Sequence, residues 1–344
     1  MSTPMTQEQR YIKMIETPIS RLIPSLAIPT IFSMLVTSIY NMADTFFVSR
    51  IGTSASAAVG VSYSLMSMIQ ALGFTLGMGS GNYLSRALGS RDAEKAERIA
   101  STGFYTAIFA GLVFAAICLP NLDTLVRLLG ATDTIAPYAK DYAKYILIAA
   151  PVMTGALSMN NLLRFQGLAV YAMIGITTGG ILNMILDPIF IFGLDLGISG
   201  AAIATALSQC ISFGILFFQS LLRKDCVHLK PGKITLSLSL YGEILHGGIP
   251  SLCRQGVASI ATAALNLAAN PFGDAAIAAL SIVSRYMMFI GSAMIGFGQG
   301  FQPVCGFNFG AKRYDRVLES YWFCVKVSAV FLTTLAVVSF VSAP

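Results

Sequence analysis

Charged residues are scarce in this chain, and their scarcity excludes most soluble classes of protein. Only 11% of the 344 residues are Asp, Glu, Lys or Arg, whereas 55% are apolar and the mean hydropathy is +0.72. Soluble domains average about 25% charged residues. The six cysteines form no Cys-x-x-Cys pair, so neither disulfides nor a zinc site are expected. The composition indicates a polytopic membrane protein, and we expect neither enzymatic activity nor a cofactor.

Three further absences narrow the class. Long alternation of β-branched residues, which an outer-membrane barrel requires, is missing, so helices remain as the way to satisfy the backbone in lipid. The N-terminal segment is polar and lacks the apolar core and cleavage site of a signal peptide. We therefore interpret residues 1–21 as a cytoplasmic tail. The net charge of +6 does not indicate nucleic-acid binding, because Lys and Arg gather in particular loops.

Nine segments are apolar and long enough to cross a bilayer, which takes roughly 20 helical residues. Lys and Arg accumulate in the tail and in the loops after even-numbered spans, which predicts a cytoplasmic N-terminus. We expect a multi-pass protein of the plasma (inner) membrane, surrounded by lipid. The predicted spans are 22–48, 55–82, 99–120, 136–163, 168–193, 198–222, 239–268, 275–303 and 317–343.

The chain repeats itself at a constant spacing of 221 residues. Six spans separate the two copies, so both halves share one orientation and a pseudo-two-fold axis along the membrane normal. The matches are Ile28-Pro29 with Ile249-Pro250, Gly52 with Gly273, and Gly89-Ser90-Arg91 with Gly310-Ala311-Lys312.

The repeat predicts an all-α fold of two six-helix lobes, in which the second lobe is incomplete. We assign residues 22–222 to the N-terminal lobe, 223–238 to a cytoplasmic linker and 239–344 to a C-terminal lobe truncated after three helices. A natural protein of nine spans is the alternative.

Two aspartates lie inside predicted spans, Asp44 in the first and Asp187 in the fifth. A charge at the bilayer centre costs roughly 3 kcal/mol on insertion scales. At 1.5 Å per residue, Asp44 lies about 9 Å below the outer end of its span, and Asp187 and Thr205 about 12 Å below theirs. Asn183 precedes Asp187 by one helical turn, on the same face. The sequence therefore predicts four oxygen-bearing side chains at one level.

Such a site suits a coupling ion. Two buried carboxylates repel each other and lose hydration, so at least one should take up a proton or bind a hard cation such as Na⁺. Tyr40 and Asn41, one turn below Asp44, could extend the network. The alternative is that the aspartates cap helices, because Asp187-Pro188 is a common element end.

Other features within the spans have structural and functional interpretations. Pro29 interrupts helical hydrogen bonding in the span that carries Asp44, and we interpret it as a hinge, with a static kink as the alternative. Arg254 and Arg285 lie within the seventh and eighth spans. For these two arginines, snorkelling or a partner in missing spans is favoured over substrate binding.

Three stretches of the sequence resemble a known family. The run Tyr40-Asn41-Met42-Ala43-Asp44-Thr45-Phe46-Phe47-Val48 after Pro29 resembles the first helix of MATE (multidrug and toxic compound extrusion) transporters. The segments Asn183-Met184-Ile185-Leu186-Asp187-Pro188 and Gly197-Ile198-Ser199-Gly200-Ala201-Ala202-Ile203-Ala204-Thr205 are similar to the fifth and sixth helices of the DinF-like or MepA-like branch.

The resemblance implies two lobes around a central cavity and antiport of amphipathic, often cationic drugs against H⁺ or Na⁺. It implies a cation site at Asp44, Asn183, Asp187 and Thr205, where Na⁺ is possible, and a kinked proline at Pro29. It also implies a substrate cavity lined by Tyr40, Asn41, Asn160, Ile176 and Gly180, although our depth estimate places Asn160 near the inner end of its span.

The sequence departs from the family pattern in two places. The seventh span has Arg254-Gln255 where the NorM-like branch carries an embedded acid, and three C-terminal spans are absent. We predict a monomeric, cation-coupled efflux antiporter for small-molecule drugs or toxins. The alternatives are a lipid-linked oligosaccharide flippase of the same superfamily, which would require a cationic cavity, and a non-transporting membrane scaffold.

Overall fold

The computed structural model describes residues 6–223, 225–269 and 274–342, and within these ranges the regular structure is entirely helical. Nine long helices coincide with the nine predicted spans, although several extend further than predicted. They are α2 (Ile19–Ser49), α3 (Thr53–Gly89), α4 (Ala93–Cys118), α6 (Ala136–Phe165), α7 (Ala169–Pro188), α8 (Gly197–Leu222), α9 (Leu238–Ala269), α10 (Asp274–Gly310) and α11 (Tyr314–Ser342).

Four shorter helical segments complete the described chain: α1 (Gln7–Glu16), α5 (Leu122–Leu128), the π-helix η1 (Ile189–Gly193) and the 3₁₀ turn η2 (Pro231–Lys233). Seven helices in the described ranges are long and apolar enough to cross a membrane: α2, α3, α4, α6, α7 with η1, α8 and α11. The fold is therefore all-α and polytopic, as predicted.

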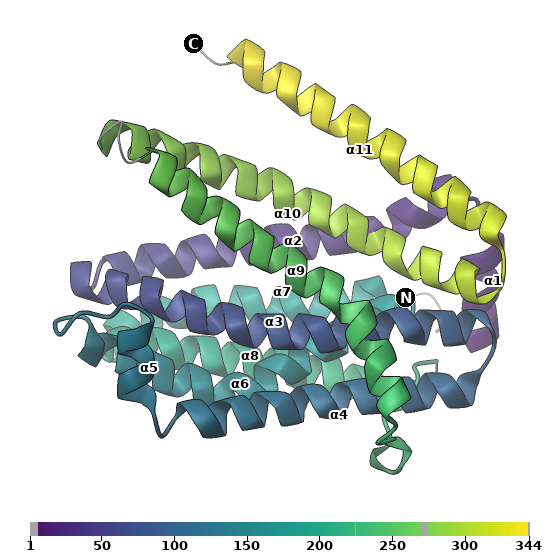
Figure 1. The fold of residues 1–344 in the computed structure, drawn as a ribbon, viewed down its shortest axis with the longest axis horizontal. Coiled ribbons are helices and arrows are strands. Elements are labelled where there is room, and N and C mark those ends of the chain that lie inside the picture. The colour runs from purple at the N-terminus through teal and green to yellow at the C-terminus, as the bar shows by residue number, and fades with distance from the viewer. Residues whose placement is uncertain (1–5, 224, 270–273, 343–344) are drawn as a thin grey trace.

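The long helices alternate in direction, so the molecule has two ends (Figure 1). We call the end where α1 lies the α1 end; it holds the turns after α3, α6, α8 and α10. The opposite end holds the turn between α2 and α3 together with α5. The axes of α10 and α11 lie close to α2 near the α1 end and diverge from it toward the opposite end (Figure 1).

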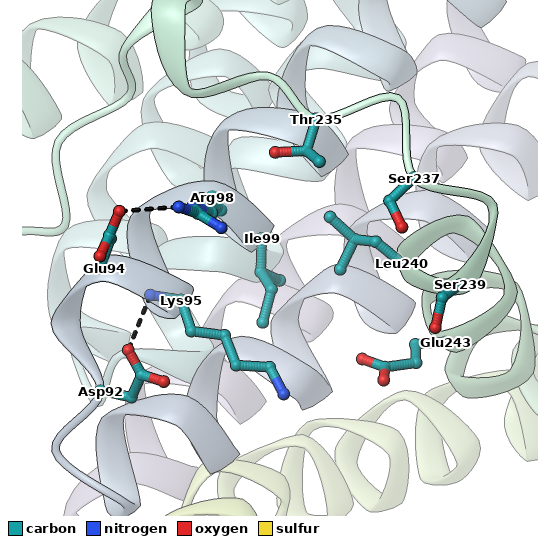
Figure 2. A pocket seen from close by; sticks show the side chains of 10 residues that line it. All are labelled: Asp92, Glu94, Lys95, Arg98, Ile99, Thr235, Ser237, Ser239, Leu240 and Glu243. Atoms are coloured by element: carbon teal, nitrogen blue, oxygen red, sulfur yellow. Dashed lines mark hydrogen bonds and ion pairs between the residues drawn. The ribbon is translucent and has the colours of Figure 1, made fainter.

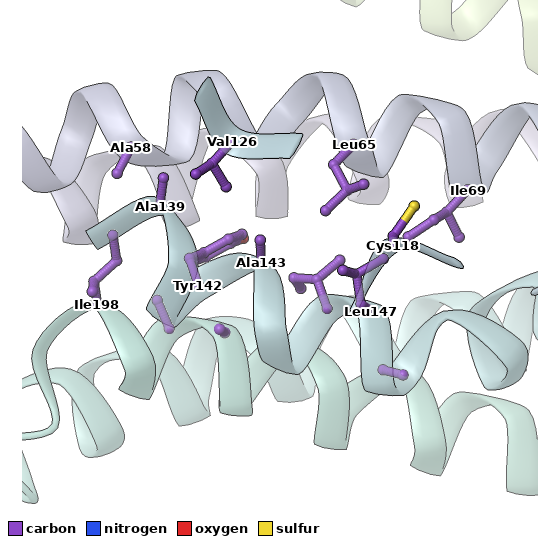
Figure 3. Close-up of a cluster of buried hydrophobic side chains, with 14 of the residues drawn as sticks. Ala58, Leu65, Ile69, Cys118, Val126, Ala139, Tyr142, Ala143, Leu147 and Ile198 are labelled. Atoms are coloured by element: carbon purple, nitrogen blue, oxygen red, sulfur yellow. The ribbon is translucent and has the colours of Figure 1, made fainter. Parts of the chain in front are cut away.

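Helix α6 forms the centre of the first six-span unit and packs on α3, α4, α7 and α8. The largest apolar cluster surrounds its N-terminal half, where Tyr142, Ile146 and Leu147 are buried against Leu65 and Ile69 of α3 (Figure 3). Fully burying a large apolar side chain contributes about 1.5 to 3 kcal/mol. This cluster holds the N-terminal half of α6 in place, close to the level of Asp44 and Asp187.

Small residues let the second helical unit approach the first closely. A Cβ atom built on Gly300 of α10 would lie 2.5 Å from the Ala27 Cα atom of α2, and one on Gly296 would lie 2.5 Å from the Ile31 Cα atom. Helices in a membrane associate through such close backbone contact, because lipid provides no hydrophobic drive between them. The α2–α10 contact therefore depends on these two glycines.

Residues 1–21, the predicted cytoplasmic tail, are partly helical: α1 lies within them, and α2 begins at Ile19. Thr6 and Gln9 form a capping box that starts α1, and Arg10, Met14 and Ile15 are buried. The tail forms a helix because it has an apolar stripe that can pack beneath the bundle. Residues 1–5 lie outside the described part of the chain.

Helix α1 connects the two helical units. The Asn308 side chain of α10 donates to the Met14 carbonyl at 3.2 Å, and the Arg316 guanidinium of α11 donates to the Thr17 carbonyl at 2.6 Å. On the other side, the Arg10 guanidinium donates to Asp225, which follows α8. The α1 end is thus held together by polar contacts as well as by close packing.

Candidate functional site

Three of the predicted cation-site residues form a connected buried group. Asp187 and Asn183 lie one turn apart on α7, and Thr205 faces them from α8. The Asn183 amide nitrogen donates to the Asp187 Oδ1 atom at 3.1 Å and to the Thr205 hydroxyl oxygen at 3.2 Å. Asp187 is 0% exposed, so its carboxyl group has no access to bulk water.

Asp44 completes the predicted set from a third helix. It lies near the end of α2, which packs along α7, and its carboxyl group is close enough to Asp187 for the two to interact electrostatically. Within the described residues neither carboxylate forms a salt bridge, although the other acids of the chain include several paired ones. The structure therefore brings the two acids together without a cationic side chain between them.

The unused hydrogen-bonding capacity of this group is its most informative property. Asp44 Oδ1, Asn183 Oδ1 and Asp187 Oδ2 are all buried and have no hydrogen-bond partner. Buried polar atoms in proteins are almost always satisfied, and an unpaired buried acceptor costs about 1 to 3 kcal/mol. Three free oxygens in one group are suited to a hard cation, and a proton on either carboxyl group would supply a donor.

The backbone around Asp187 is unusual as well. The residue before a proline normally ends a helix, but here α7 includes Pro188 and continues into the π-helix η1. The α-helix does end at Asp187-Pro188, but helical backbone continues through η1, and Ile189 rather than Asp187 is the cap residue of α7. Single-turn π segments are rare and occur frequently at functional sites.

Charged cavities lie toward the α1 end, away from the aspartates. One, of about 330 Å³, is bordered by the start of α4 and the segment that leads into α9 (Figure 2). It carries charges of both signs: the Arg98 guanidinium donates to Glu94 at 2.8 Å, and the Lys95 backbone nitrogen donates to Asp92 at 2.9 Å. Another cavity is lined by arginines and is described below.

The MatE family model matches residues 29–189 and 250–344 of this sequence. These two segments include Asp44, Asn183 and Asp187, and together they make up well over half of the chain. This chain belongs to the MatE family. The repeated match, once in each helical unit, agrees with the internal repeat found in the sequence.

Named relatives of this MatE protein are exporters. It is 28% identical over 329 residues to the "Multidrug export protein MepA" of Staphylococcus haemolyticus (strain JCSC1435), covering 94% of this chain and 72% of that protein. The MepA protein of Staphylococcus aureus (strain NCTC 8325 / PS 47) is 29% identical over 317 residues, covering 90% of this chain and 68% of the relative. The MatE chain is thus a transporter of the MepA-like type.

Solved structures support the same assignment. A crystal structure of MATE in complex with MaL6 matches with a TM-score of 0.90 and 30% identity, covering 96% of this chain and 73% of that chain. A transporter of the MOP superfamily from Pyrococcus furiosus Vc1 (DSM3638) matches with a TM-score of 0.88 and 30% identity, covering 99% and 74%. This chain therefore shares the arrangement of its nine long helices with each of these two solved structures.

One residue of the MatE site was not predicted from the sequence. Tyr142 of α6 is 0% exposed, its hydroxyl group donates to the Met66 Sδ atom at 3.7 Å, and it lies near Thr205, Asp44 and Asp187. Tyrosines are common in apolar spans, so nothing in the local sequence distinguishes Tyr142 from Tyr145. Only the packing of α6 against α8 places its hydroxyl group beside the aspartates.

The predicted substrate-cavity residues are distributed over two levels. Tyr40 lies over Gly180, where an added Cβ atom would come within 2.9 Å of the tyrosine ring. Asn160 lies near the α1 end, and its amide donates to the Ala172 carbonyl at 3.0 Å. Asn41 and Ile176 are half-buried on α2 and α7. Their role in substrate binding remains a prediction.

Pro29 lies inside α2, and the hydroxyl groups beside it bond to nearby backbone carbonyls. The Ser33 hydroxyl donates to the Pro29 carbonyl at 2.9 Å. The Thr30 hydroxyl lies 2.8 Å from both the Ala27 carbonyl and the Gly296 carbonyl of α10. The proline segment is therefore joined to the second helical unit, which is the position that a hinge between the units would require.

Proposed function

We propose that this protein is a cation-coupled multidrug exporter of the plasma membrane that moves amphipathic, often cationic compounds out of the cell. One observation carries the proposal. Asp44, Asn183 and Asp187 present three buried oxygens with no hydrogen-bond partner, and two of them belong to carboxyl groups that no cation neutralises within the described residues. The drug class is supported by the MepA relatives, which are named multidrug export proteins.

The coupling ion, H⁺ or Na⁺, would act by neutralising this pair. Two carboxylates that approach each other in a low-dielectric interior repel strongly, and a bound cation or proton removes the repulsion. Helices α2 and α7 can then pack more closely where Asp44 and Asp187 meet. Moving one charge across 100 mV supplies about 2.3 kcal/mol, which is sufficient for modest coupling.

Helix α2 provides a physical connection between the ion site and the second helical unit. Asp44 lies on the same helix as Ser38, whose hydroxyl is 2.7 Å from the Ser292 hydroxyl of α10. Further along, Thr30 bonds to the Gly296 carbonyl beside Pro29. A bend at Pro29 that responds to the charge state of Asp44 would therefore alter the α2–α10 contact and the relation between the two units.

The decisive experiment measures drug efflux from membrane vesicles with a pH gradient and a Na⁺ gradient imposed separately. Asp44→Asn and Asp187→Asn each remove one carboxylate, and we expect both to abolish the dependence of efflux on the coupling gradient. Asp195→Asn is the matched control, because Asp195 is exposed and its φ of 53° is a conformation that asparagine tolerates.

Unchanged gradient-driven efflux in both site variants would overturn the proposal. Transport of a lipid-linked headgroup in proteoliposomes without any drug transport would instead favour the flippase alternative. Size measurements in detergent would test the expectation that the protein acts as a monomer.

A further inference from the structure

A second cavity lies between the two helical units, near the α1 end, and its polar lining is incompletely satisfied. Its volume is about 400 Å³. It is bordered by α3 and α6 of the first unit and by α9 and α10 of the second. The residues that line it include Asn82, Arg86, Ser251, Arg254 and Gln302 among the polar ones, and Met78, Phe165, Pro250, Phe301 and Phe309 among the apolar ones.

Within the part of the chain that the structure describes, the guanidinium group of Arg86 forms no salt bridge. It lies between two aromatic rings, 5.1 Å from the Tyr83 ring centre and 4.7 Å from the Phe309 ring centre. Its Nε atom is buried and has no hydrogen-bond partner. Stacking between rings holds the plane of the guanidinium in place, but it leaves the N–H donors free for an acceptor.

Arg254 adds a second positive charge from α9. Its side chain borders the cavity, is exposed, and forms no salt bridge within the described residues. The neighbouring Ser251 is only 7% exposed, and its hydroxyl oxygen is buried without a partner. Ser251 therefore presents a further unused donor in the same wall, three residues before Arg254. The side chain of Arg285, the other arginine predicted within these spans, lies outside the described part of the chain.

A third guanidinium lies directly behind the lining. Arg164, in the last turn of α6, is 1% exposed and donates to Asn161 Oδ1 at 2.7 Å and to Gln302 Oε1 at 3.2 Å. Its Nε atom is buried and unpartnered as well. The C-terminal dipole of α6 stabilises this cation in part. Gln302 borders the cavity, so only its neutral amide group separates the positive charge of Arg164 from the cavity.

The described residues that line it include no Asp and no Glu, in contrast to the cavity in Figure 2, which is bordered by Asp92, Glu94 and Glu243. A buried cation is stable only when it is paired or solvated. Arginine presents planar N–H donors that match a carboxylate or a phosphate. The surrounding aromatic rings and Met78 offer an apolar surface next to that donor set, which suits a molecule with one anionic group and one apolar part.

We propose that this cavity binds an anionic amphiphile, with its phosphate or carboxylate group between Arg86, Ser251 and Arg254 and its apolar part against Phe165, Phe301 and Phe309. The site is separate from the coupling-ion site and does not depend on it. The ligand could be a phospholipid headgroup that enters between the units or a soluble anionic compound, because both present the same chemistry to the arginines.

Binding of lipid to the purified chain tests the proposal directly. Native mass spectrometry in a neutral maltoside detergent would compare phosphatidylglycerol with phosphatidylcholine of the same acyl chains. We expect phosphatidylglycerol to bind about tenfold more tightly, because both lipids carry the phosphodiester but the choline of phosphatidylcholine adds a cation beside the arginines. Octyl phosphate, added as a competitor, distinguishes a site for phospholipid from a site that also takes soluble anionic compounds. Displacement of phosphatidylglycerol shows that soluble amphiphiles share the site, and binding of the lipid alone assigns the site to lipid.

The variants are chosen to separate binding from folding. Arg254→Gln removes an exposed charge, so the fold should be retained, and we expect about tenfold weaker binding of phosphatidylglycerol. Arg254→Lys keeps the charge and should retain most of the affinity, and Arg86→Gln should behave as Arg254→Gln does. Arg313→Gln is the matched control, because Arg313 lies at the same end but pairs with the exposed Asp315.

Two outcomes would overturn the assignment. One is equal binding of phosphatidylglycerol and phosphatidylcholine by the unmodified chain. The other is an Arg254→Gln protein that binds phosphatidylglycerol as tightly as the Arg313→Gln control. Either result would show that Arg86 and Arg254 serve only packing and solubility at the α1 end.

Discussion

Asn183 and Asp187 are joined by a hydrogen bond of 3.1 Å, and each keeps one buried oxygen without a partner. The bond orients the carboxyl group of Asp187 and uses one of the two amide donors of Asn183. The other donor is used by Thr205 at 3.2 Å. The amide is therefore the centre of the group, and the free oxygens on either side of it are positioned by α7 alone.

Removing the Asn183 amide should change the binding of the coupling ion without disturbing the fold. For Asn183→Ala we expect the Na⁺ concentration for half-maximal efflux to rise about tenfold, because the substitution removes a free oxygen that suits the cation. With H⁺ as the coupling ion, the proton concentration for half-maximal efflux should fall instead, because the amide N–H favours the charged carboxylate of Asp187. Efflux from vesicles at varied pH and Na⁺ measures it. Asn121→Ala is the control, since Asn121 bonds only to the Ile117 carbonyl at the opposite end. An unchanged ion dependence would exclude Asn183 from the site.

Tyr142 provides a test of a residue that only the structure identified. Tyr142→Phe keeps the ring in its cluster but removes the hydroxyl group near Thr205 and the two aspartates, so we expect a loss of ion affinity of about fivefold, corresponding to about 1 kcal/mol for one polar contact. The same efflux titration measures it. Tyr145→Phe, on the same helix and packed against the same cluster, should leave the titration unchanged. Equal effects of the two substitutions would mean that the Tyr142 hydroxyl has no part in ion binding.

The contact between α2 and α10 can be tested with two glycines on one helix. Gly300→Ala would place a methyl group 2.5 Å from the Ala27 Cα atom, whereas the Cβ atom of Gly298→Ala would meet nothing within 4 Å. We expect Gly300→Ala to destabilise the protein by about 1 to 3 kcal/mol through overpacking. Gly298→Ala should stabilise it by up to about 1 kcal/mol, because alanine favours helix. Thermal unfolding in detergent compares them, and equal midpoints would contradict the close contact.

The stability of the α1 end should depend on Asp225. Burial alone would raise the pKa of Asp225, but hydrogen bonds from Arg223 and the charge of Arg10 outweigh burial, so its pKa lies below the ordinary value. Asp225→Ala leaves Arg10 buried without its partner, and we expect a loss of about 3 kcal/mol at neutral pH. The unfolding midpoint measures this loss. Asp315→Ala is the exposed control and should change stability little.

The lowered pKa of Asp225 also predicts in which direction the stability of the protein changes with pH. A carboxylate whose pKa is lowered by folding contributes stability that is fully present above its unfolded pKa of about 3.9. That contribution is lost as the pH falls through the lowered value. The difference between the unmodified protein and Asp225→Ala should therefore persist at pH 7 and shrink below about pH 4. A difference that stays constant from pH 7 to pH 3 would show that the ion pair is not its cause.

Much of the fold followed from local properties of the sequence. Apolar stretches of about 20 residues must form helices in lipid, because no other open structure satisfies the backbone there. Asp44 and Asp187 stood out because an embedded charge is costly, and a rise of 1.5 Å per residue was enough to place them near one level. The helical position of Asn183 one turn before Asp187 followed from the same geometry.

The sequence by itself determined the class of protein, the nine helices and the presence of embedded acids, since these depend on hydropathy and on spacing along one helix. Only the tertiary structure decided which side chains meet from different helices. The approach of Tyr142 to Thr205, the burial of α1 against α10 and α11, and the arginine cavity all depend on how helices pack. Packing is set by many contacts distant in sequence, and no single stretch of residues encodes it.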